Sequence, residues 1–190
     1  NTKVVATSAN VTVENAASIS ELAAIDTAIA TMTYSTVADT TANAVTNTGS
    51  YITGSKTVTI TDADSTAITA TNLSTIGALT TGTVTVTNAI AISGTQSQVT
   101  AALVTDASKV VVSDATVTIS DVDTTELEVT DLSTIGGKTT GVVTVSNAVV
   151  LTGTQAELEA ALITANTKVV ATSANVTVEN AASISELAAI

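Results

Sequence analysis

The chain begins and ends with the same sequence. Residues 1–25 recur without a single change as residues 166–190, so that Asn1 corresponds to Asn166 and Ile25 to Ile190. Such an identity does not arise by chance. We therefore interpret residues 1–165 as one tandem period and residues 166–190 as the start of the next identical period. A chain built by repetition is typically selected for length or surface rather than for one reactive pocket.

A shorter repeat lies within the long one. Its motif is an apolar residue, a threonine and a second apolar residue. The motif's central threonines are Thr12, Thr33, Thr59, Thr85, Thr118, Thr144 and Thr177. Their intervals are unequal, and the last of them is the copy of the first, so six coils make up one period.

The motif predicts strands with one buried face. Strict alternation places the flanking apolar residues on one side of a strand and the threonine on the other. Shortly after most of these motifs comes an Asn or Asp, as at Asp62, Asn88, Asp121 and Asn147. Strands that recur at this rate are typical of stacked coils that bury their apolar faces together. We therefore predict an all-β fold, a parallel β-solenoid of six coils per period, wound right-handed like most parallel crossovers.

Some connections between the strands have a helical pattern. Thr154 and Glu157 have the spacing of a capping box, and Leu158, Ala161 and Leu162 follow at helical spacing. Ser18 and Glu21 repeat the pattern in a shorter form. The sequence thus predicts short helical segments in some coils.

Composition excludes several classes of function. The net charge is −12, which disfavours binding to nucleic acid. No apolar run is long enough for a transmembrane helix, so we expect no membrane insertion. Aromatic residues make up 1% of the chain, and Cys, His and Arg are absent. The usual nucleophiles, proton shuttles and transition-state clamps are therefore missing, and we expect no catalytic residues and no enzyme activity.

Two pairs of acids are the candidate metal ligands. Asp62 and Asp64 form one pair, and Asp121 and Asp123 form an equivalent pair in a later coil. Closely spaced carboxylates are the ligands that Ca²⁺ prefers. Alternatively, Asp62 and Asp121 occupy a corner of the coil and their partners solvate a turn. Calcium is the only cofactor that the sequence suggests.

The threonines raise a second binding hypothesis. Flat ice-binding solenoids display two parallel Thr columns, and the central threonines form one such column here. A second column, one step earlier on the same strand face, is broken by Asn10 and Val142. The alternative is that Thr simply suits an exposed strand surface.

Part of the chain resembles a known group of proteins. The stretches 18–26, 31–43 and 49–62 resemble repeats of very long bacterial surface proteins, common in cyanobacteria and described as β-strand-repeat proteins. The resemblance implies secretion and a role in surface layers, fibres or adhesins, and it brings no catalytic residues.

These observations favour a structural function. We expect an extracellular or cell-surface filament or coat, formed by continuous stacking, with self-association end to end or laterally. The alternative is a binding module: an adhesin stalk, or a calcium-binding or ice-binding solenoid.

Overall fold

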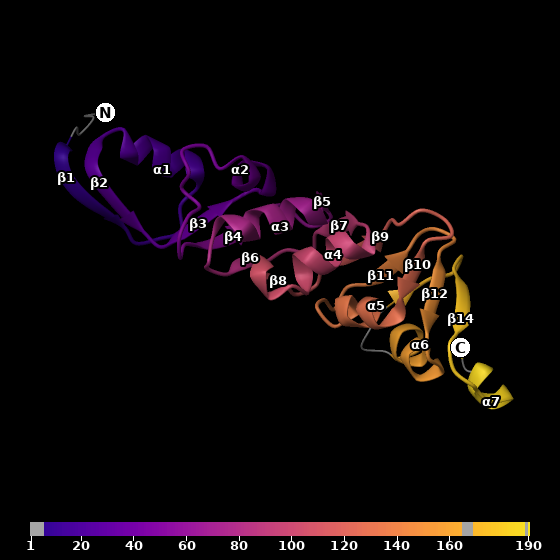
Figure 1. Cartoon of the computed structure of the whole chain (residues 1–190). Coiled ribbons are helices and arrows are strands. Elements are labelled where there is room, and N and C mark those ends of the chain that lie inside the picture. The colour runs from indigo at the N-terminus through magenta and orange to yellow at the C-terminus, as the bar shows by residue number, and fades with distance from the viewer. Residues whose placement is uncertain (1–5, 165–168, 189) are drawn as a thin grey trace.

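The chain forms an elongated stack of strand–helix layers. In the computed structural model, which describes residues 6–164, 169–188 and 190, the first and last layers lie at opposite ends of the molecule (Figure 1). Each layer ends in an α-helix, and successive helices follow one another along the long axis. None of the described helices is long and apolar enough to cross a membrane.

The described residues form seven such layers. In chain order these are β1 (Ala6–Val13) and α1 (Ile19–Asp26); β2 (Ile29–Tyr34), β3 (Thr36–Asp39) and α2 (Thr41–Thr46); β4 (Thr57–Ile60), β5 (Ala67–Thr69) and α3 (Ala70–Leu79); β6 (Val84–Val86), β7 (Ala91–Gly94) and α4 (Gln96–Leu103); β8 (Val110–Val112), β9 (Thr116–Ile119), β10 (Glu126–Glu128) and α5 (Val129–Gly136); β11 (Val143–Val145), β12 (Val150–Gly153) and α6 (Gln155–Leu162); and β13 (Val169–Val170), β14 (Asn175–Val178) and α7 (Ile184–Leu187). A short 3₁₀ turn, Asp106–Ser108, precedes β8.

The strands pair in parallel, each with strands from the adjacent layers. They form four small sheets, which we number I (β1-β2), II (β3-β4-β6-β8), III (β13-β11-β9-β7-β5) and IV (β10-β12-β14). In sheet III the inward residues Ile68, Ile92, Val117, Val143 and Val169 form one buried column across five layers. Burying each of these side chains contributes about 1.5–3 kcal/mol. The core is therefore continuous along the stack.

The prediction of an all-β, parallel β-solenoid is wrong. The fold is mixed α/β, with several small parallel sheets, no closed solenoid, and a helix at the end of every described layer. The connection 72–77, which contains Leu73 and Ile76, is part of α3, and both side chains are fully buried. The predicted capping boxes of α1 and α6 are confirmed.

Most of the described helices begin at a capping hydroxyl side chain. Six of the seven described helices have a Ser or Thr N-cap whose oxygen accepts a hydrogen bond from a backbone N–H in the first turn: Ser18, Thr40, Thr69, Thr95, Thr154 and Ser183. Such caps satisfy a helix donor that would otherwise lack a partner. The prediction missed Thr40, Thr69 and Thr95, because the chain is so rich in Thr that a cap is not distinguishable from a strand threonine.

The predicted single column of strands is also wrong. It placed Val117 next to Val84 across one long coil. In the structure Val84 pairs with Val110, and Val117 pairs with Ile92. Strand β8 lacks a threonine and therefore does not carry the motif. The strands that carry the motif belong to four sheets, which the prediction merged into one column.

The sheet that supplies the strand before each helix changes along the stack. That strand belongs to sheet I for α1, to sheet II for α2, to sheet III for α3 and α4, and to sheet IV for α5, α6 and α7. The fifth layer makes one of these changes with three strands, β8, β9 and β10. The rows of strands therefore shift sideways as the stack rises.

Candidate functional site

The acidic pairs lie in equivalent loops that join two strands of one layer. Asp62 and Asp64 follow β4, and Asp121 and Asp123 follow β9. Each loop contains one non-glycine residue with a left-handed backbone, Ser65 or Thr124. The recurrence of the pairs in the sequence thus reflects a repeated loop geometry.

The first acid of each pair points to the helix of the preceding layer. Asp62 Oδ2 accepts hydrogen bonds from the backbone N–H of Thr41 at 2.6 Å and from its hydroxyl at 2.7 Å. Asp121 Oδ2 accepts from the backbone N–H of Gln96 at 2.6 Å. Thr41 and Gln96 are the first residues of α2 and α4. A carboxylate at a helix N-terminus is stabilised by the helix dipole and by N–H donors without an intrahelical partner.

The second acid of each pair points to the following layer. Asp64 Oδ1 accepts from the backbone N–H of Ala89 at 3.0 Å, and Asp123 Oδ1 accepts from that of Ala148 at 2.9 Å. At the second loop, the side-chain amide of Asn147 also donates to the carbonyl of Asp121 at 2.6 Å. The two acids of a pair therefore bond to opposite neighbours and link three layers.

This geometry supports the alternative interpretation of the acids as corner residues. One oxygen of each of the four carboxylates accepts a hydrogen bond from the chain itself. Among the described residues, no group of three or more His, Cys, Asp or Glu side chains is arranged to hold a metal ion. The backbone donors facing Asp62 and Asp121 favour an anion rather than a cation. Calcium binding stays a prediction.

Two further residues cap helices in the same way, and the sequence did not single them out as caps. Asp39 Oδ2 accepts from the backbone N–H of Ile19 at 2.9 Å, and Asn180 Oδ1 accepts from that of Gln155 at 2.8 Å. Ile19 and Gln155 are the first residues of α1 and α6. The sequence signal for Asn180 is its place three residues after the motif threonine Thr177, the place that Asp62 takes after Thr59. Asp39 ends β3 and has no such place relative to a motif.

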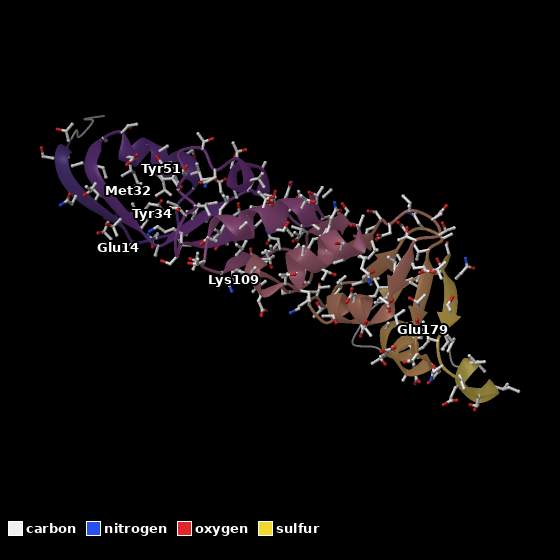
Figure 2. All side chains as sticks on the ribbon, in the orientation of Figure 1. Glu14, Met32, Tyr34, Tyr51, Lys109 and Glu179 are labelled. Atoms are coloured by element: carbon white, nitrogen blue, oxygen red, sulfur yellow. The ribbon has the colours of Figure 1, made fainter. Side chains whose placement is uncertain are left out.

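The two tyrosines form a small cluster near the N-terminal end (Figure 2). Their rings meet edge to face, with centroids 6.3 Å apart, and the Tyr34 hydroxyl donates to the carbonyl of Tyr51 at 2.7 Å. The Lys56 ammonium lies 4.4 Å from the centre of the Tyr34 ring. Burial raises the pKa of both tyrosines, and Asp26 contributes to the rise. The two tyrosines therefore pack against each other as neutral phenols.

The threonines of the predicted column belong to four sheets, and Thr177 lies opposite Thr152 in sheet IV. Thr12 pairs with Thr33 in sheet I, Thr59 with Thr85 in sheet II, and Thr118 with Thr144 in sheet III. The next residues in the second and third rows are Val111 and Val170. The structure therefore contains short Thr rows rather than one long Thr face.

Two other features of the described residues are a pair of glutamates and a surface groove. Glu126 and Glu128 are exposed on the outer side of β10, with Leu127 buried between them. A groove of about 270 Å³ lies between α1 and α2, and Asn43 and Ser20 are among its polar lining residues. None of the residues that line it is titratable. No protein-family model, curated protein or solved structure matches the chain.

Proposed function

We propose that the protein is a structural component of an extracellular filament or surface coat, built by continuous stacking of parallel strand–helix layers. The proposal rests on one observation about the repeated segment, residues 1–25 and 166–190. In its first copy, this segment pairs with the strand that follows it: Val11 lies opposite Met32. In its second copy, it pairs with the strand that precedes it: Val176, the counterpart of Val11, lies opposite Leu151.

The same sequence therefore pairs through opposite edges at the two ends of the chain. A strand that pairs through both edges at once would join sheet IV of one period to sheet I of the next. The neighbours of such a strand would be β12 on one side and β2 on the other. A strand that is hydrogen-bonded on both sides has no unpaired edge. An unpaired edge would otherwise be free to pair with other chains and promote aggregation.

The surface chemistry suits a long extracellular polymer. The net charge of −12 keeps neighbouring chains apart in solution, and the absence of Cys excludes disulfide cross-links. The hydrogen bonds that link the layers use side chains without His or Cys, so their strength does not depend on redox state or on pH near neutrality. Both properties fit a scaffold exposed to its surroundings.

Negative-stain electron microscopy of tandem arrays tests this proposal. Chains of one, two and three periods, each period being residues 1–165, should form rods of constant width. Each period should add roughly 29 Å, the height of six layers at the ordinary spacing of parallel strands. Compact particles whose width grows with the number of periods would contradict it. Thermal melts with calcium or chelator, and an ice-recrystallisation assay, test the binding-module alternatives on the same samples.

A further inference from the structure

The C-terminal end of the stack exposes apolar side chains that the first copy of the same sequence buries. Ile184 of α7 is 89% exposed, whereas its counterpart Ile19 in α1 is 6% exposed. Leu187 is 48% exposed, whereas Leu22 is fully buried. The sequences are identical, so the difference arises from what covers each copy.

The second layer covers the first copy through three kinds of contact. Strand β2 pairs in parallel with β1, and the Ala38 N–H donates to the carbonyl of Ala17 at 2.9 Å. Asp39 caps the backbone N–H of Ile19 at the start of α1. Helix α1 packs against β2 and β3. The cover thus combines strand pairing, a charged helix cap and apolar burial.

We infer that the end face formed by Val176, Ala182, Ile184 and Leu187 is the docking surface for a second copy of the segment 29–46, placed after residue 190 in tandem order. This inference rests on the proposed function and names the partner of its open end. In the docked state the second copy of Asp39 accepts from the Ile184 N–H, and the second copy of Ala38 donates to the carbonyl of Ala182.

Covalent continuation is favoured over a separate molecule. In a separate folded chain, the segment 29–46 is already paired with its own β1 and α1. Releasing it would expose as much apolar surface on that chain as docking would bury on this one. A tandem copy carries no such cost, because its preceding layer is the end face itself.

Hydrogen exchange on an extended chain tests the inference. The full chain is compared with the same chain carrying a second copy of residues 26–60 after Ile190. Amides of residues 184–188 should exchange at least about tenfold more slowly in the extended chain, because docking removes local opening. A matched control carries Val37→Asp and Asp39→Ala in the appended copy only, and its amides should exchange at the rate of the unextended chain.

Two outcomes would overturn the inference. One is unchanged exchange in the extended chain. The other is a concentration-dependent dimer of the unextended chain that protects residues 184–188, which would assign the face to a separate molecule. The result is separable from the proposed function. If the end face is protected in the extended chain but multi-period arrays form compact particles, the filament proposal is contradicted and the docking surface is retained.

Discussion

At the residue scale, side-chain chemistry matches the backbone group that each Asx residue meets. Asp62 and Asp121 face backbone N–H groups, and carboxylates only accept hydrogen bonds. Asn88 and Asn147 face backbone carbonyls, and their amides donate to them. The sequence predicted that an Asn or Asp recurs after the strand motifs, but it could not distinguish residues that accept from an N–H from residues that donate to a carbonyl. These two roles depend on whether the neighbouring layer presents a helix start or a loop.

Exchanging Asn for Asp and Asp for Asn at two contacting positions should change the free energy of unfolding by unequal amounts. Asn147→Asp places an acceptor against the Asp121 carbonyl, 2.6 Å from the present donor, and should lower the free energy of unfolding by about 1–3 kcal/mol. Asp121→Asn keeps an acceptor for Gln96, as Asn180 does for Gln155, and should cost less than about 1 kcal/mol. Urea denaturation measures both. Equal losses would contradict the assignment.

The capping-box glutamates should titrate below their ordinary range. Hydrogen bonds from the backbone and the hydroxyl of Thr154 lower the pKa of Glu157 below its ordinary value of 4.5. Because the folded pKa is depressed, this carboxylate stabilises the fold above its unfolded pKa. That stabilisation is lost as the pH falls through the folded pKa. NMR titration should show the lowered pKa, and Thr154→Ala should return it toward 4.5. A Glu157 pKa unaffected by Thr154→Ala would count against the box.

At the element scale, the strands were more predictable than the helices. The apolar-Thr-apolar motifs at Val58–Ile60 and Val143–Val145 are strands β4 and β11, because alternation fixes which face is buried. The helices were predicted only where a Glu completes the capping box. Elsewhere Gln98 completes the box at α4, α5 has no side-chain cap, and the caps of α2 and α3 are lone hydroxyls. At Thr69, for example, strand alternation and helix capping use the same residue type. Local pattern therefore could not decide between strand and helix start.

The backbones of adjacent layers approach each other closely at Gly141, just before β11, and a substitution there tests this contact. A Cβ at Gly141 would lie 2.2 Å from the backbone oxygen of Ala115 in the preceding layer. Gly141→Ala should therefore destabilise the fold by about 1–3 kcal/mol, because backbone must move. Gly137→Ala is the matched control: its nearest contacts are 3.4 Å or longer, and its effect should stay within about 0.5 kcal/mol. Thermal melts that rank the two variants equally would contradict the close stacking.

At the scale of the whole molecule, the repeat was predictable and the path of the layers was not. The identity of residues 1–25 and 166–190 indicates a tandem array, and one strand spacing recurs within sheets II and III. The sideways change of sheet along the stack depends on contacts between residues of adjacent layers. Loops such as that after Asp121 provide those contacts. A sequence motif indicates where strands occur, but it does not indicate to which sheet each strand belongs.

The two copies of the repeated segment should differ in local stability within one molecule. The backbone N–H of Leu22 bonds to the carbonyl of Ser18, and that of Leu187 bonds to the carbonyl of Ser183, each at 3.0 Å. The bonds match, but Leu22 is buried under the second layer and Leu187 is not. Leu22 should exchange at least about tenfold more slowly. Equal exchange rates in the intact chain would mean that burial by the next layer does not protect the helix.

The most direct test of continuous stacking is a cryo-electron microscopy structure of a two-period chain. We predict that the middle copy of the repeated strand, Asn175–Val178, pairs in parallel through both edges. Leu151 should lie opposite Val176 on one side, and the second-period copy of Met32 should lie opposite it on the other. A middle strand that pairs with β12 alone, with the second period folded as a separate body, would contradict the account.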